Sequence, residues 1–152
     1  MTYWPVKNED DLESLKAFLK ENALPADDIR LEGNQFAIYR DSAGKMVGTG
    51  GLEFYGDYCL LRSVAVAPGY RGTGLGKEIV KDLISRAEVK SVWSISLLTE
   101  TAQPFFEKLG FETVLREKAP KEIQASSEFS TVCPVSAVLM SLNVTHSKSQ
   151  PG

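Results

Sequence analysis

The chain has few of the residues that build metal centres and disulfide frameworks. Its 152 residues include two cysteines, Cys59 and Cys133, and a single histidine, His146. Neither cysteine belongs to a C-x-x-C motif, and a zinc site usually needs three or four Cys or His ligands. We therefore expect free thiols, a cytoplasmic protein and no metal ion.

Long apolar runs and a surplus of basic charge are also missing. No apolar stretch approaches the ~20 residues of a membrane-spanning helix, and the N-terminus lacks the basic-then-apolar pattern of a signal peptide. The formal net charge is −3, whereas nucleic-acid-binding domains are usually basic. These absences predict a chain with neither a membrane nor a nucleic acid as partner.

The periodicity of apolar residues predicts alternating helices and strands. Leu12, Leu15, Phe18 and Leu19 form the stripe of a first helix, capped by Asp10 or Asp11, and a short helix or a loop follows over 26–31. Strands are expected at 36–40, 45–55, 58–67, 92–99, 111–115 and 134–142, and further helices at 74–89, 101–109 and around 120–126. The first three strands predict an antiparallel meander, and 92–99, apolar on both faces, predicts a central strand parallel to 60–67. Without repeats or linkers, this pattern indicates one α+β domain over 1–142 and a disordered tail over 143–152.

The most informative segment is LLRSVAVAPGYRGTGLG, residues 60–76. Its β-rich part ends at Pro68, a basic glycine-rich turn follows, and a helix begins near Leu75. The first backbone N–H groups of this helix have no carbonyl partner within the helix, and they lie at the positive end of its dipole. This arrangement binds phosphate. Glycine lets the backbone approach an anion closely, and Arg71 adds a cation. The segment therefore predicts a site for a phosphorylated ligand.

Two common phosphate-binding loops do not fit this segment. A P-loop requires G-K-S/T, but Gly76-Lys77 is followed by Glu78. The glycines at 72, 74 and 76 lack the G-x-G-x-x-G spacing of dinucleotide-binding folds. An ordinary glycine-rich strand-to-helix turn is the alternative. The pattern R-x-x-G-x-G after Val-Ala-Val-Ala-Pro resembles the pyrophosphate loop of the GNAT superfamily of acetyl-CoA-dependent N-acetyltransferases.

The predicted order of elements is also the one that GNAT proteins show, so the resemblance covers about residues 3–142. It implies an α+β fold in which a mixed central sheet of six to seven strands is flanked by helices, with a β-bulge that splays two strands apart at the cofactor site. It implies acetyl-CoA as the acetyl donor, whose carbonyl is polarised by main-chain N–H groups at Val64 and Val66. The implied cofactor-binding residues are Val64, Ala65, Val66, Arg71, Gly72, Thr73, Gly74, Leu75, Gly76, Thr101, Phe105 and Phe106.

A second family segment occupies residues 99–111, where many members have N-x-x-A-x-x-x-Y-x-x-x-G-F. Ala102, Gly110 and Phe111 fit this pattern, whereas Thr99 replaces Asn and Phe106 replaces Tyr. The family tyrosine commonly protonates the departing thiolate, and a phenyl ring cannot. Either another group supplies this proton or the thiolate leaves unassisted.

Three residues are candidates for the chemistry of acetyl transfer: Glu53, Arg62 and Thr99. Glu53, on the strand paired with the loop strand, is predicted to be the general base, and a solvated sheet glutamate is the alternative. Arg62 lies near the sheet centre, where an unpaired cation is costly, so we expect it to pair with Glu53 or to clamp an anionic group of the substrate. Thr99 and Thr101 are candidates for binding the pantetheine amides or a water, or for capping a helix.

Several further stretches resemble the arsenic-resistance N-acetyltransferase subfamily, which shares the Thr and Phe replacements. They include Gly51-Leu52-Glu53, Leu60-Leu61-Arg62-Ser63, Leu97-Leu98-Thr99-x-Thr101-Ala102 and Ser127-Glu128-Phe129-x-x-x-Cys133-Pro134. The resemblance implies acetylation of the primary amine of a small molecule, amino-acid-like or arsenic-containing. A catalytically silent acyl-CoA sensor and a peptide or protein N-acetyltransferase stay open as alternatives. Dimers are frequent in the family, which leaves a homodimer open with 135–142 as a candidate interface strand.

Overall fold

The computed structural model describes residues 1–132 and 136–144. The chain divides into two compact units. Unit 1 comprises residues 1–53 and 61–83, and unit 2 comprises 54–60 together with the described residues from 84 onwards. Each unit is taken by itself below.

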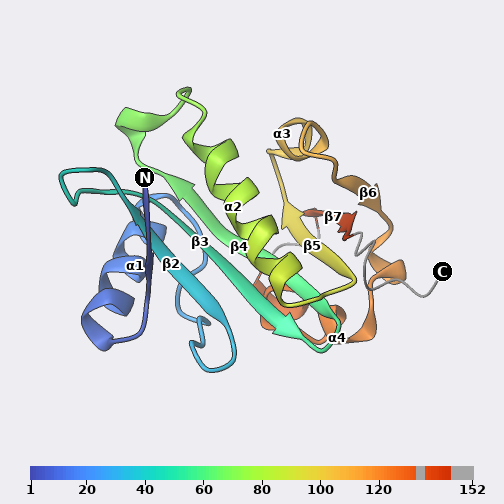
Figure 1. Cartoon of the computed structure of the whole chain (residues 1–152). Helices are drawn as coiled ribbons and strands as arrows, with labels where there is room; N and C mark the ends of the chain where they lie inside the picture. The colour runs from blue at the N-terminus through green and yellow to red at the C-terminus, as the bar shows by residue number, and fades with distance from the viewer. Residues whose placement is uncertain (133–135, 145–152) are drawn as a thin grey trace. The chain divides into compact units, whose positions relative to one another are not determined.

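The described residues contain seven strands in one mixed sheet, with the strand order β1-β2-β3-β4-β5-β7-β6 (Figure 1). This confirms the predicted fold class, a mixed sheet flanked by helices. The strands are β1 Thr2–Pro5, β2 Gln35–Arg40, β3 Met46–Tyr55, β4 Tyr58–Val66, β5 Ser94–Thr99, β6 Glu112–Val114 and β7 Val138–Asn143. The helices are α1 Glu9–Glu21, α2 Leu75–Val89, α3 Gln103–Glu107 and α4 Lys121–Gln124, with 3-10 turns at Pro68–Tyr70 and Arg116–Lys118 and a π-helical turn at Glu128–Val132.

In unit 1 the predicted antiparallel hairpin of β2 and β3 is confirmed. Gln35 pairs with Leu52, and the register continues to Tyr39 and Gly48. The turn between these strands closes where the amide of Asp41 donates to the carbonyl of Lys45 at 2.9 Å. Strand β1, which pairs antiparallel with β2, was not predicted, because its four residues T-Y-W-P have no apolar alternation.

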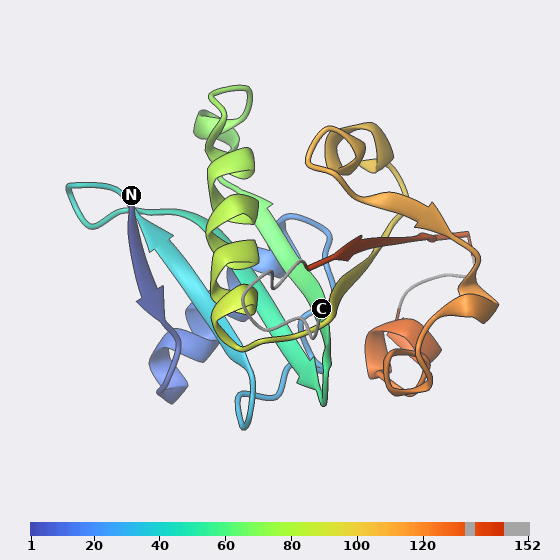
Figure 2. The same cartoon turned by 45° about the vertical axis from the view of Figure 1, so that its right-hand side comes forward.

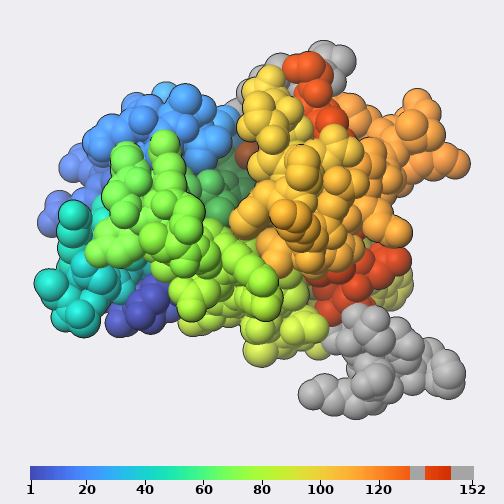
Figure 3. All heavy atoms as spheres, turned by 90° about the horizontal axis from the view of Figure 1, so that it is seen from above, coloured from blue at the N-terminus to red at the C-terminus, as the bar shows by residue number. Residues whose placement is uncertain are grey.

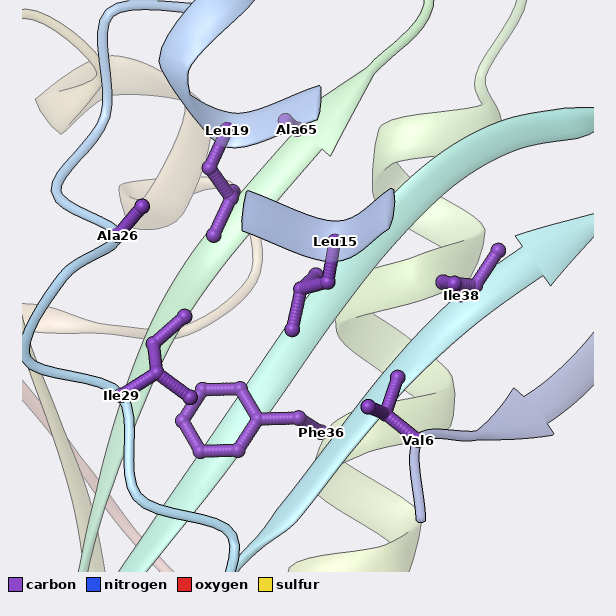
Figure 4. Close-up of a cluster of buried hydrophobic side chains, with 8 residues drawn as sticks. All are labelled: Val6, Leu15, Leu19, Ala26, Ile29, Phe36, Ile38 and Ala65. Atoms are coloured by element: carbon purple, nitrogen blue, oxygen red, sulfur yellow. The ribbon is translucent and has the colours of Figure 1, made fainter. Parts of the chain in front are cut away.

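Helix α1 covers one face of the unit 1 strands. Its N-cap is Asn8, whose side chain accepts a hydrogen bond from the amide of Asp11 at 2.8 Å. The predicted caps Asp10 and Asp11 are therefore wrong, and both lie in the first helical turn, where the helix dipole favours negative charge. Figure 4 shows the core between this helix and the strands, made of Val6, Leu15, Leu19, Ala26, Ile29, Phe36, Ile38 and Ala65. The segment 26–31 is a loop, the second of the two alternatives.

Helix α2 packs closely on the opposite face of β3 (Figure 2). A Cβ at Gly48 would lie 2.5 Å from Cδ1 of Ile79, and a Cβ at Gly50 would lie 2.5 Å from Cδ1 of Leu83. A Cβ at Gly51, which faces the other way, would lie 2.4 Å from the ring of Phe36. The G-T-G-G run of β3 therefore leaves room for a helix on one face and an aromatic ring on the other.

In unit 2 the predicted parallel pairing is confirmed, because Tyr58–Leu60 of β4 pair with Ser94–Ser96 of β5. Strand β7 pairs antiparallel with both β5 and β6. Helix α3 is shorter than the predicted 101–109, since Ala102 already acts as its N-cap.

The predicted start of the last strand at 134 lies outside the described residues. The first two residues of the predicted tail are ordered, because Asn143 ends β7 and the amide of Val144 donates to the carbonyl of Trp93 at 2.9 Å. From residue 145 on, the predicted tail lies outside the described residues.

Candidate active site

The predicted phosphate loop connects the end of β4 to the start of α2 in unit 1. Gly72 and Gly74 have φ angles of 80° and 87°, in the left-handed region that favours glycine. No atom lies within 4 Å of a Cβ built at either position. Backbone conformation, and not crowding by neighbouring protein atoms, therefore requires glycine at these two positions. Figure 3 shows this part of the chain, in green, at the surface.

Several backbone N–H groups of the loop have no acceptor among the described residues: those of Gly72, Gly74, Leu75 and Gly76. The amides of Arg71 and Thr73 make only long bonds of 3.4 Å, to the carbonyls of Pro68 and Tyr70. These orphan donors adjoin the positive end of a 15-residue helix. The arrangement fits the diphosphate group of a bound nucleotide.

Side chains from two distant segments of unit 1 hold the loop. The guanidinium of Arg71 donates from Nη2 to Oδ1 of Asn22 at 2.7 Å, and Asn22 in turn donates from Nδ2 to the carbonyl of Phe18 in α1. The hydroxyl of Tyr70 donates to Oδ2 of Asp41, in the β2–β3 turn, at 3.0 Å. The sequence analysis did not identify Asn22 and Asp41 as partners of this loop.

The pKa of Asp41 is lowered and the pKa of Tyr70 is raised in the folded protein. The backbone N–H of Lys45, 2.9 Å from Oδ1, lowers the pKa of Asp41, and the hydroxyl of Tyr70 adds to this effect. The hydrogen bond to that carboxylate raises the pKa of Tyr70. Near neutral pH the pair therefore consists of an ionised carboxylate and a protonated phenol, the forms that sustain the bond.

A left-handed residue interrupts strand β4. Ser63 is 8% exposed and has a φ angle of 62°, unusual for a residue with a Cβ. Its carbonyl accepts a hydrogen bond from Oγ1 of Thr49 at 2.8 Å. Such an irregularity is what the implied β-bulge requires, and it directly precedes Val64, Ala65 and Val66.

The guanidinium of Arg62 lies at the centre of a buried cluster in unit 1. Its side chain is 0% exposed, and it binds both carboxylate oxygens of Asp28, at 2.6 and 2.8 Å. It also donates from Nη1 to Oε2 of Glu53 at 3.1 Å, from Nε to Oγ of Ser63 at 3.1 Å, and from Nη2 to the carbonyl of Pro25 at 3.4 Å. These five bonds equal the five N–H donors of a guanidinium. The predicted pairing with Glu53 is confirmed, and a clamp on a substrate anion would require Arg62 to release a partner.

Glu53 and Asp28 reach Arg62 from different segments. Glu53 lies on β3 and is 3% exposed, so the alternative of a solvated sheet glutamate is wrong. Asp28 lies in the loop before β2 and was missed by sequence reasoning. A buried arginine needs a carboxylate partner, but the sequence does not decide whether Asp28 or the neighbouring Asp27 pairs with Arg62. In the structure Asp27 pairs with Lys20 at the surface, 3.1 Å apart.

The remaining predicted site residues lie in unit 2. Oγ1 of Thr99 accepts a hydrogen bond from the amide of Ala102 at 3.0 Å, but the N-cap of α3 is Ala102 and no side chain caps this helix, so the capping alternative for Thr99 and Thr101 is wrong. Thr101 is exposed. Phe106 is 8% exposed and makes edge-on contacts with Phe105 and Phe111, with ring centroids 5.0 and 5.7 Å apart. The ring that replaces the family tyrosine is thus part of an aromatic cluster.

The part of the chain that the structure describes lacks two features, a metal-binding cluster and a membrane-spanning helix. It contains no group of three or more His, Cys, Asp and Glu side chains placed to hold a metal ion. None of its helices combines the length and the apolar character needed to cross a bilayer.

Comparison with known proteins finds sequence relatives and many structural neighbours. Glucosamine 6-phosphate N-acetyltransferase of Trypanosoma brucei brucei is 40% identical over 58 residues, which are 38% of this chain and 40% of that protein. N-acetylglutamate synthase of Neisseria gonorrhoeae, complexed with coenzyme A and N-acetyl-glutamate, superimposes with a TM-score of 0.75 at 15% identity over 95% of this chain and 36% of that one. The ribosomal-protein-S18-alanine N-acetyltransferase of Escherichia coli gives 0.72 at 20% identity over 99% and 96%.

The sequence relative is matched over less than half of its own length, and the two structures share the fold. A family model described as an acetyltransferase (GNAT) domain matches residues 32–113, more than half of the chain, and its match includes β2–β5 and the phosphate loop. The chain therefore belongs to the GNAT acetyltransferase family.

Proposed function

We propose that this protein transfers the acetyl group of acetyl-CoA to the primary amine of a small molecule. The observation that carries the proposal is the loop before α2, where orphan amides, two left-handed glycines and Arg71 adjoin a helix N-terminus in a GNAT chain. The donor supplies an acetyl group activated as a thioester. Arg71–Gly76 would hold its diphosphate and thereby limit where the thioester can lie.

Two other parts of unit 1 would act on the reacting atoms. Main-chain N–H groups at Val64 and Val66, after the irregularity at Ser63, would polarise the thioester carbonyl. Glu53 would remove a proton from the substrate ammonium, directly or through a water, because an ammonium has no lone pair with which to attack. A C–N bond then forms as the C–S bond breaks.

The leaving thiolate has no proton donor at position 106. Phe106 is packed among aromatic rings and cannot supply a proton. A thiol has a pKa of about 8.5, so a thiolate is a tolerable leaving group without assistance. The roles of Thr99, Thr101, Phe105 and Phe106 in unit 2 remain predictions from the resemblance.

Two comparisons support a small amine as the acetyl acceptor. The sequence relative is an acetyltransferase of an amino sugar phosphate, and one structural neighbour is an N-acetylglutamate synthase. Both names refer to small amines that carry an anionic group. The arsenic-resistance subfamily, and with it an amino-acid-like or arsenic-containing acceptor, follows from the resemblances at 51–63, 97–106 and 127–138. A cytoplasmic location and a homodimer likewise remain predictions.

Two other functions are each favoured by one observation. Phe106 in place of the family tyrosine favours a catalytically silent acyl-CoA sensor. The similarity to an S18-alanine N-acetyltransferase favours a peptide or protein acceptor.

One experiment separates the three. The protein is incubated with acetyl-CoA and a panel of amines that includes amino acids, glucosamine 6-phosphate, an arsenic-containing amino acid and short peptides. Free thiol is measured continuously, and the acetylated product is identified by mass spectrometry. We expect thiol release with a small amine above the rate without amine. Binding of acetyl-CoA without release for any amine would establish the sensor, and release with peptides alone would establish the third function.

A further inference from the structure

We propose that Asp28 is a positioning residue for acetyl transfer: through Arg62 it fixes the carboxylate of Glu53 and the left-handed turn of β4 at Ser63. The proposal deepens the proposed function and rests on it, because Glu53 is the base of that reaction. Asp28 comes from a loop that carries none of the predicted site residues.

The geometry makes Asp28 the contact that orients the guanidinium. Two parallel bonds, of 2.6 and 2.8 Å, join its carboxylate to Nη1 and Nη2 of Arg62. A bidentate contact of this kind sets both the plane and the rotation of the planar guanidinium. The remaining N–H groups are then directed at Oε2 of Glu53 and Oγ of Ser63.

The two directed contacts reach the two places where the reaction needs precision. The bond to Glu53 holds one oxygen of the proposed base, whose side chain is 4% exposed. The bond to Ser63 holds the side chain of the residue at φ 62°, which directly precedes the main chain proposed to polarise the thioester. Misplacement of either group by a fraction of an ångström would lower the rate, since catalysis depends on near-attack geometry.

Charge provides an argument that does not depend on geometry. One carboxylate would neutralise Arg62, yet two lie within ion-pair distance of its guanidinium. Desolvating a second carboxylate is costly, and a purely structural anchor would not need it. A second carboxylate suits a site that must take a proton from a cation. The other charged pair on the same loop, Asp27 with Lys20, is exposed at the surface.

The test compares Asp28→Asn with Asp27→Asn, an adjacent change of the same chemistry at a surface ion pair. With the amine identified above, we expect Asp28→Asn to lower kcat by about 10- to 100-fold and to leave the dissociation constant of CoA within about twofold of the wild-type value. The loss should appear in kcat with little change in the KM for the amine, because Asp28 orients the base and does not itself contact the substrate. Asp28→Glu should restore part of the rate, and Asp27→Asn should resemble the wild type.

A role for Asp28 in folding alone would lower kcat and the fraction of protein that binds CoA in equal proportion, and this outcome would overturn the proposal. So would an unchanged kcat in Asp28→Asn. A readout without activity is the urea unfolding of Asp28→Asn, Glu53→Gln and the double variant, in which we expect non-additive losses of stability because both carboxylates bind one guanidinium. Additive losses would contradict the shared cluster. If the losses are non-additive but the protein acetylates no amine, the shared cluster is supported. The proposed function, and with it the positioning role of Asp28 in acetyl transfer, would then be overturned.

Discussion

At the scale of single residues, Arg62 shows how far a buried charge depends on its neighbours. Removal of one partner from a buried ion pair typically costs about 3–5 kcal/mol, because the other charge stays desolvated. Arg62 has a second carboxylate, so a neutral residue at either acidic position still leaves it one counterion. The two carboxylates can therefore be changed one at a time without leaving an unpaired cation.

This makes Glu53→Gln an informative variant. Glutamine keeps the size of the side chain and an oxygen that can accept from Arg62, but it cannot take a proton from the acceptor. We expect turnover to fall by about 100-fold or more, the usual contribution of a general base. The deficit should be greatest at low pH, where the amine is protonated, and should narrow as the pH approaches the pKa of the amine.

Initial rates across a pH series would measure this effect. Glu32→Gln is the matched control, because Glu32 is an exposed residue of the loop before β2. A rate profile of Glu53→Gln that runs parallel to that of the wild type would show that Glu53 is structural.

The sequence could predict the partner of Arg62 only in part. Its position in a sheet strand implied a counterion, and Glu53 on the neighbouring strand was close enough to propose. Asp28 could not be chosen over Asp27, because their order in a loop without periodicity does not decide which one faces the sheet. Ser63 could not be placed in the left-handed region either, since the hydrogen bond to its carbonyl comes from Thr49, on the neighbouring strand β3.

At the scale of elements, the sequence predicted best the strand, glycine-rich loop and helix that make up the proposed phosphate loop. Its glycines, the proline before it and the helix after it act through local geometry, which a sequence shows directly. The reason for the glycines needed the structure, because Gly72 and Gly74 are required for their positive φ and Gly48 and Gly50 for the approach of α2.

Replacement of Gly74 by alanine should therefore weaken the binding of CoA. A residue with a Cβ is destabilised by about 1–2 kcal/mol in the left-handed region. The free loop of the variant can avoid this strain by changing its conformation, but the conformation that binds CoA cannot. We expect the dissociation constant to rise by about 5- to 30-fold, measured by calorimetry. Gly69→Ala is the control, because Gly69 lies in the same connection with no atom within 4 Å of its Cβ and no positive φ. Equal affinities in the two variants would argue against the loop as the diphosphate site.

The Asp41–Tyr70 contact gives the β2–β3 turn and the phosphate loop a common pH dependence. Because the native pKa of Asp41 is lowered, its contribution to stability is complete above its ordinary value of 3.8 and is lost as the pH falls through the native value. The native pKa of Tyr70 is raised above 10.0, so its contribution is complete below that pH and is lost as the pH rises through the native value.

Urea unfolding of the wild type and of Asp41→Asn should test this at the acid end. We expect the difference in unfolding free energy to be constant between about pH 5 and 8 and to shrink below about pH 4. Tyr70→Phe, which removes only the hydroxyl, should show a smaller change of the same sign at low pH, because the N–H of Lys45 still lowers the pKa of Asp41 in this variant. A difference between wild type and Asp41→Asn that is independent of pH would contradict the assignment.

At the scale of the whole molecule, the order of elements was predictable because most of them carry their own local pattern. The stripe of α1, the tight turns of the meander and the doubly apolar β5 are all visible in the sequence. Strand β1 at the edge of the sheet is held by pairing with β2, a non-local contact, and its own residues give no signal. Helix α3 begins only at Gln103, because Ala102 is its N-cap, and it is therefore shorter than its apolar pattern suggests.

The single domain predicted over residues 1–142 can be tested against the two compact units. Each of the three points at which the chain passes from one unit to the other lies inside a regular element, β3, β4 or α2. We therefore expect the units to unfold in one cooperative transition.

The chain provides a fluorescent probe for each unit, because its two tryptophans, Trp4 and Trp93, lie in unit 1 and unit 2 respectively. In Trp4→Phe and in Trp93→Phe, the fluorescence of the remaining tryptophan and the far-ultraviolet circular dichroism of the same sample should give one urea midpoint. Comparison within each variant cancels the cost of the substitution. A fluorescence midpoint that differs from the dichroism midpoint in either variant would show that the two units unfold separately.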